Sequence, residues 1–263
     1  MSGCSSFSTA SSSSCSSHSP TPSTANECDS FDMKMASIDT LIDDYEGEEA
    51  FKRLTEIQPT VDDNRWVAFS YRFAQACYIR FNQWSEEKKQ AERLELIRRG
   101  LEAVERAYQL DKDHFDVLTQ CAVLTGTLAE NSGVKDKVKL GFQCKVYLDA
   151  ALVKNPNHFA LLHMRGRFLL QLAELSWVEK KAARVLFGKL PEASYDLALE
   201  DLLKADSNLP SAIDNLLYIG KSYKGKGDKK KAREYLNKVI ALNAEDAVDA
   251  EQIAEAKLLL TKL

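Results

Sequence analysis

The sequence is poor in residues that interrupt helices and in the groupings that hold metals. Its 263 residues include only six prolines and eleven glycines, a content that favours long helices over a turn-rich β architecture. The six cysteines form no CxxC pair and show no metal-ligand spacing with the four histidines. We therefore expect a reduced compartment, no metal and no cofactor.

Long apolar runs are also absent. The best candidate, residues 159–178, is interrupted by Arg165, Arg167 and Glu174, so no membrane span is expected. The first 33 residues contain neither Lys nor Arg and lack the basic start and apolar run of a signal peptide. The cytoplasm is the expected location.

Catalytic motifs are missing as well. The sequence has no Gly-rich phosphate loop, GxSxG elbow, HExxH helix or coherent Cys-His pairing. His158 and His163 are five residues apart and share no helical face well, so a role in packing or at the surface is expected for both. These absences argue against an enzyme.

A Ser/Thr-rich segment opens the chain. Residues 1–30 have too little apolar surface to offset the entropy of ordering, and we expect a disordered tail. Ser19 and Thr21 each precede a proline, as sites of proline-directed kinases do, although such pairs also arise by chance in a Ser-rich tract. Residues 31–263 are expected to form one helical repeat domain, which begins with a helix pair on either side of Gly47.

Internal repetition is the strongest signal. The segment 216–246 matches the spacing of the tetratricopeptide repeat, a helix-turn-helix unit of about 34 residues. The matching residues are Leu216, Ile219, Gly220, Tyr223, Ala232, Leu236 and Val239. Gly220 and Ala232 are small, as is required where two helices cross closely.

Three more degenerate units precede this one, with longer connections between helix A and helix B. They pair a helix led by Trp66 with one around Gly100, a helix at 118–125 with one at 144–151, and a helix around Gly166 with one at 198–205. The predicted fold is all-α, a short solenoid of tetratricopeptide-like hairpins with extended inserts. The alternative is a set of amphipathic helices in some other bundle.

The segments 172–206, 215–242 and 141–168 together resemble the regulator of microtubule dynamics family. The resemblance covers residues 35–263, and its most specific element is Trp-x-Glu-Lys-Lys at Trp177, inside an insertion that ordinary tetratricopeptide repeats lack. The resemblance implies a non-enzymatic protein associated with microtubules, the spindle, the spindle pole and chromosome segregation, with tubulin and mitotic proteins as partners. Some family members have an N-terminal membrane anchor and are associated with lipid binding, but the Ser-rich start of this chain does not fit an anchor.

Charge is unevenly distributed. Residues 1–64 contain twelve Asp or Glu and three Lys or Arg, whereas residues 65–263 contain 27 acidic and 32 basic residues. The lysines concentrate in the expected A-to-B loops, which lie along one edge of a solenoid. The microtubule-binding candidates there are Lys180, Lys181, Arg184, Lys224, Lys226, Lys229, Lys230, Lys231 and Arg233, and smaller groups at Lys88 and Lys89 and at Lys135, Lys137 and Lys139 extend the edge.

Two readings of this basic edge compete. It would attract the acidic tails of tubulin, or its lysines are solvated loop residues that keep the protein soluble. Nucleic acid is not expected, because no recognised binding motif accompanies the charge.

A phospholipid-binding module is the alternative function. The inserts would then cover the concave groove to form an apolar tunnel lined by Trp177, Val185, Leu186 and Phe187. The competing interpretation is ordinary core packing of these residues at helical spacing.

Overall fold

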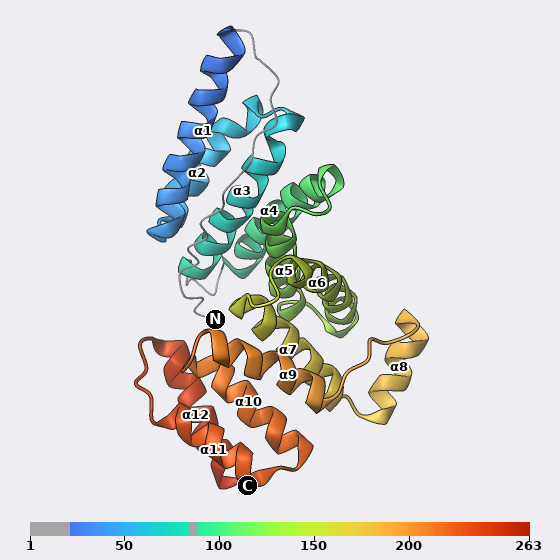
Figure 1. Cartoon of the computed structure of the whole chain (residues 1–263). Coiled ribbons are helices and arrows are strands. Elements are labelled where there is room, and N and C mark those ends of the chain that lie inside the picture. The colour runs from blue at the N-terminus through green and yellow to red at the C-terminus, as the bar shows by residue number, and fades with distance from the viewer. Residues whose placement is uncertain (1–21, 85–88) are drawn as a thin grey trace. The chain divides into compact units, whose positions relative to one another are not determined.

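The structure, a computed structural model, describes residues 22–84 and 89–263, and all regular structure in these residues is helical (Figure 1). The α-helices are α1 Pro22–Asp43, α2 Gly47–Ile57, α3 Asp63–Gln83, α4 Gln90–Leu110, α5 Phe115–Glu130, α6 Val134–Lys154, α7 Phe159–Glu174, α8 Trp177–Phe187, α9 Tyr195–Asn208, α10 Ile213–Lys226, α11 Lys229–Ile240 and α12 Ala247–Thr261. One 3-10 turn, η1 Gln58–Thr60, follows α2. The predicted all-α fold is confirmed for these residues. None of their helices is both long enough and apolar enough to cross a bilayer.

The described residues form two compact units, one that ends at Leu128 and one that extends from Ala129 to Leu263. A helical repeat contacts only its neighbours in the chain, so a solenoid has no single central core. Division into units is compatible with the predicted repeat domain at 31–263, whose limits stay a prediction.

Helix α1 begins at Pro22, inside the segment 1–30 that the sequence predicts to be a disordered tail. The limits of the predicted tail, residues 1–30, stay a prediction. Residues 1–21, which include Ser19 and Thr21, lie outside the described residues. Further along α1, Phe31, Met35 and Ile38 are buried, and α1 packs on both α2 and α3.

In the first unit, α3 and α4 form a helical hairpin. The side chain of Asp62 accepts a hydrogen bond from the backbone N–H of Arg65 and so caps the start of α3. The indole Nε1 of Trp66 donates to the carbonyl of Ala103 on α4, at 3.0 Å. A Cβ on Gly100 would lie 2.9 Å from Leu124 Cδ1, so this position must be small. The Trp66-led helix thus packs as an A helix against its predicted partner.

In the second unit, α7 packs on α9, and α8 occupies the insert between them. A Cβ on Gly166 of α7 would lie 2.6 Å from Leu202 Cγ of α9, which shows how closely the two helices approach. Ser176 and Ser194 cap the starts of α8 and α9. The extended insert predicted in this repeat is therefore confirmed, and it contains a helix of its own.

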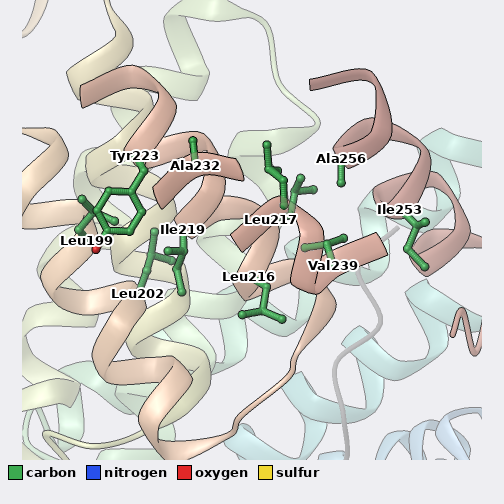
Figure 2. Packing of buried hydrophobic residues seen from close by; sticks show 11 residues of the cluster. Leu199, Leu202, Leu216, Leu217, Ile219, Tyr223, Ala232, Val239, Ile253 and Ala256 are labelled. Carbon is green, nitrogen blue, oxygen red and sulfur yellow. The ribbon is translucent and has the colours of Figure 1, made fainter. Parts of the chain in front are cut away.

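The last hairpin, α10 and α11, is completed by α12. Figure 2 shows its core, in which Leu216 of α10 lies near Val239 of α11 and Ile219 of α10 lies beside Leu202 of α9. Ile253 of α12 belongs to the same cluster. A Cβ on Gly220 would lie 2.8 Å from Leu236 Cγ, and Ala232 is fully buried. The predicted tetratricopeptide-like packing of this repeat is confirmed.

Candidate interaction surface

Six basic residues surround the turn between α10 and α11, and we call them the α10–α11 basic cluster. They are Lys224, Lys226, Lys229, Lys230, Lys231 and Arg233. The turn is short: α10 ends at Lys226, Gly227 adopts a left-handed conformation with φ +88°, and the Asp228 side chain accepts a hydrogen bond from the backbone N–H of Lys231. The glycine permits the tight turn, and the aspartate caps α11. Ordered helix ends therefore hold the six cations close together.

The position of three of these lysines opposes the electrostatics of the helix. Lys229, Lys230 and Lys231 fill the first turn of α11, which contains no acidic residue. The N-terminus of a helix is its positive end, and a cation there costs about 0.3–1 kcal/mol when exposed. Only the cap, Asp228, offsets this locally. The stability of α11 therefore does not explain why three lysines lie in its first turn.

Three of the six basic residues in the cluster contact other residues of the chain. Lys226 forms an ion pair with Asp196 of α9, and that hydrogen bond raises the pKa of the Lys226 amine. Lys229 donates to the backbone oxygen of Leu263 at 3.1 Å, and Lys231 lies 5.0 Å above the Tyr223 ring. In the part of the chain that the structure describes, Lys224, Lys230 and Arg233 have no ion-pair partner. These three cations are available to an external anion.

The basic residues of α8 have different surroundings. The Lys180 amine donates to the carbonyl of Ala173 at 3.2 Å, near the C-terminus of α7, and is half-buried. Lys181 is exposed, with its amine 5.2 Å from the centroid of the Trp177 ring, and Arg184 is exposed in the last turn of α8. Of these three candidates, Lys180 is engaged with backbone and the other two face solvent.

The start of α9 lies beside the end of α10. Besides the Lys226–Asp196 pair, a Cβ on Gly225 would overlap the ring of Tyr195, the first residue of α9. The exposed Lys189 precedes Tyr195 by six residues, a span of about 20 Å at most. The linker after α8 therefore leads to the residues of α9 that lie beside the end of α10, where the α10–α11 basic cluster begins.

One part of the prediction for the basic edge is wrong. The cations were expected in loops, but most of them lie in helices: Lys135, Lys137 and Lys139 in α6, Lys180, Lys181 and Arg184 in α8, and the α10–α11 basic cluster in the last turn of α10 and the first two turns of α11. The connecting turns are shorter than the periodicity indicates. Lys88 lies outside the described residues, and Lys89 is half-buried with its amine 5.3 Å from the centroid of the Trp84 ring.

Two residues assigned to core packing or to an apolar tunnel are instead on the surface. Trp177 is 73% exposed and Val185 is 80% exposed. The described residues cover neither side chain, so neither packs in a core or lines a tunnel there, and α8 projects from the α7–α9 hairpin in Figure 1. The prediction for Trp177 as a repeat-packing residue is therefore wrong.

A buried polar group joins α7 to α10. The Asn215 amide donates to the carbonyl of Leu202 at 2.9 Å, which turns its oxygen toward His163 Nδ1, 3.0 Å away. Burial lowers the pKa of His163 below its ordinary value of 6.5, while the Asp214 carboxylate, 3.2 Å from Nε2, opposes this shift. Because the Asn215 oxygen can only accept, Nδ1 donates in this hydrogen bond. The packing role predicted for His163 is confirmed, but its partner, 52 residues away, could not be read from the sequence.

The cysteines of the described cores are chemically inert. Cys77, Cys121 and Cys144 are buried, and burial raises the pKa of each thiol to about 12. A thiol with such a pKa stays protonated at neutral pH and is a weak nucleophile. These residues serve packing.

Comparison with known proteins gives consistent matches. The family model described as regulator of microtubule dynamics protein 1-3 matches residues 34–263. The chain is 35% identical over 219 residues to regulator of microtubule dynamics protein 1 of Caenorhabditis elegans, and the match covers 83% of this chain and 95% of that protein. It is 28% identical over 236 residues to regulator of microtubule dynamics protein 2 of Homo sapiens, with 88% of this chain and 56% of that protein covered. The chain thus spans nearly all of the nematode relative and about half of the human one.

Solved structures match at low sequence identity. A mutant of MamA matches with a TM-score of 0.54 and 16% identity, over 83% of this chain and 100% of that chain. YrrB, described as a TPR protein with an unusual peptide-binding site, matches with a TM-score of 0.49 and 17% identity, over 90% of this chain and 97% of that chain. The likeness to MamA concerns the fold alone.

Proposed function

The chain belongs to the regulator of microtubule dynamics family, and from this membership we propose that it is a non-enzymatic, microtubule-associated protein that binds acidic segments of tubulin through the α10–α11 basic cluster. The names of its relatives support a microtubule-related role. The choice of surface is our proposal.

The observation that carries this proposal is the first turn of α11. Three lysines stand at the positive end of a helix, where they weaken the helix, and Lys230 and the nearby Arg233 have no ion-pair partner among the described residues. Residues that reduce stability without an internal partner are typical of binding sites. Microtubules display acidic tubulin tails, and exposed pairs with them would each contribute about 0–1 kcal/mol, so several would act together.

The rest of the proposal follows from the same binding. The helical hairpins act as a scaffold, the protein resides in the cytoplasm on the cytoskeleton, and in dividing cells it is found at the spindle and spindle poles, where it supports chromosome segregation together with mitotic proteins. The protonated thiols and the buried, hydrogen-bonded His163 favour a binding protein over an enzyme. Fluorescence microscopy of the tagged full chain in dividing cells tests the location, and a diffuse signal that ignores the spindle would contradict it.

Sedimentation with stabilised microtubules tests the binding. We expect the chain to sediment with microtubules at about 50 mM salt and to be released by about 300 mM, because the Debye length shrinks from roughly 14 to 6 Å. Removal of the acidic tubulin tails with subtilisin should release it as well. Binding that resists both treatments would show that the basic cluster is not the contact, and a chain that never sediments would contradict microtubule association itself.

A further inference from the structure

Helix α8 presents an uncovered face that is both apolar and cationic. Trp177, Val178 and Val185 are exposed by 73, 68 and 80%. Lys181 and Arg184 are also exposed. A rotation of 100° per residue places all five side chains on one side of the helix. We call these five residues the α8 face. In Figure 1 this helix projects from the α7–α9 hairpin.

No carboxylate belongs to the α8 face. The single acidic residue of α8, Glu179, lies on the opposite side of the helix and is held by a capping box. Its carboxylate accepts a hydrogen bond from the backbone N–H of Ser176 at 2.8 Å, while its own N–H donates to the Ser176 hydroxyl. The α8 face therefore suits a ligand that combines negative charge with an apolar group.

Two occupants fit this chemistry poorly. A second copy of the chain would bring Lys181 and Arg184 against the same cations, because a twofold contact repeats one patch on both partners. A membrane would be contacted by only three apolar side chains and two cations. This apolar surface is too small for stable attachment, since even a whole myristoyl chain gives only marginal membrane binding. An acidic peptide needs neither a large apolar area nor a matching helix.

The α8 face also continues toward the α10–α11 basic cluster. The linker after α8 contains the exposed Lys189 and leads to Tyr195 and Asp196, which contact Gly225 and Lys226 at the end of α10. Cations therefore occur on α8, in the linker that follows it and at the end of α10, to which this linker leads. The two surfaces are placed to hold successive parts of one acidic segment.

We infer that the α8 face binds a bulky apolar side chain of the same acidic segment that the α10–α11 basic cluster holds, with Trp177 as the contact. This rests on the proposed function for the acidic part of the ligand. The α8 face adds selectivity: it distinguishes acidic peptides that contain an aromatic residue from those that do not, whereas the basic cluster responds to charge alone.

Two synthetic peptides separate these roles. Both consist of glutamate and glycine, and one has a central phenylalanine where the other has alanine. Binding to the full chain is followed by tryptophan fluorescence, since Trp177 is exposed whereas Trp66 is buried and Trp84 is half-buried. The phenylalanine should increase affinity about three- to tenfold, which corresponds to about 0.7–1.4 kcal/mol for an aromatic pair.

Three variants complete the experiment. Trp177→Ala with Val185→Ala should abolish the preference for phenylalanine, with affinity read by peptide anisotropy, while Val153→Ala, an equally exposed valine at the end of α6, should keep it. Lys230→Glu with Arg233→Glu should weaken both peptides equally and leave the preference unchanged. Circular dichroism checks that each variant folds.

The outcomes are distinguishable. Equal binding of both peptides by the wild type, with loss of both in the Lys230→Glu and Arg233→Glu variant, overturns the role of the α8 face and leaves the proposed function standing. If neither peptide binds but tryptophan emission shifts with vesicles of anionic phospholipid, the α8 face contacts membranes and the inference is wrong. If neither ligand has an effect, both the inference and the acidic-segment proposal fail.

Discussion

Two helical hairpins of this molecule share a packing scheme and differ in their cations. Helices α3 and α4 contain seven arginines and no lysine, whereas α10 and α11 contain seven lysines and one arginine. Arginine has a planar fork that fixes several hydrogen bonds at once, while lysine is a compact, strongly hydrated charge on a flexible stem. The difference indicates that one hairpin uses cations to build itself and the other presents them to solvent.

The arginines of α3 and α4 have structural partners. Arg72 forms a two-pronged pair with Asp39 of α1, at 2.6 and 2.7 Å. Arg93 is almost fully buried, donates twice to the carbonyl of Phe81 and stacks on the Phe81 ring at 4.5 Å. Such groups would be costly to leave unpaired. The arginines thus belong to the fold of the first unit.

The lysines of α10 and α11 divide into two groups. Lys221 and Lys238 pair with Glu255 and Glu234, and Lys226 pairs with Asp196. The others crowd the turn between the helices, where a repeat needs only a few polar residues. The contrast between the paired arginines and the crowded lysines supports an external partner for the α10–α11 turn. Substitutions in both hairpins test it.

The largest expected loss of stability tests the packing that the two hairpins share. Gly100→Leu and Gly220→Leu should each lower the free energy of unfolding by about 1–3 kcal/mol or more, because the new side chains would overlap Leu124 and Leu236. Urea unfolding followed by circular dichroism measures this. Gly133→Leu is the control, since a Cβ there meets nothing within 4 Å. Tolerance of leucine at either position would show that its hairpin is packed differently.

An arginine-to-lysine exchange tests the contrast in cations. Arg93→Lys keeps the charge but loses the fork that binds the Phe81 carbonyl, and we expect a cost of about 1–2 kcal/mol. The matched exchange Arg233→Lys, at an exposed position of α11, should change stability by less than about 0.5 kcal/mol. Equal effects in urea unfolding would remove the distinction between structural and presented cations.

The smallest effect concerns pH and His163. Because burial lowers the pKa of His163 in the folded chain, the unfolded chain binds its proton first, and the stability from this group is lost as pH falls below 6.5. Asp214, Arg167, Asn215 and Glu130 face the ring or act on it. We expect acidification from pH 7.5 to 5.5 to destabilise the wild type more than His163→Gln. An identical loss in both proteins would mean that His163 is not held neutral.

Sequence periodicity predicted the hairpins because their packing rule is local. Small residues such as Gly220 and Ala232 recur at the spacing at which two neighbouring helices cross, so the last repeat could be located without the structure. The exposure of one face of α8 could not be predicted in this way. Helical spacing gives Trp177 and Val185 a common face, but whether another helix covers that face depends on the rest of the chain.

Partners of the buried polar groups were also beyond the sequence. The distance along the chain is 52 residues from His163 to Asn215 and 36 residues from Arg165 to Asp201, and nothing in the local pattern connects them. The exact helix ends could not be predicted either. The sequence pattern placed the run of lysines in a loop, whereas Gly227 and Asp228 form the turn and the lysines lie in the adjoining helices.

The most direct test of the account reverses the three lysines at the start of α11. Lys229→Glu, Lys230→Glu and Lys231→Glu together replace cations with anions at the positive end of a helix, which favours the helix by about 0.3–1 kcal/mol per residue. This gain offsets the lost contacts of Lys229 with Leu263 and of Lys231 with Tyr223, so the variant should stay folded. Microtubule affinity at low salt should fall at least about tenfold, because attractive pairs become repulsive. The control reverses three exposed lysines elsewhere, Lys34, Lys204 and Lys257, and should bind more strongly than the test variant. Undiminished sedimentation of the folded triple variant with microtubules would contradict the assignment of this cluster as the binding surface.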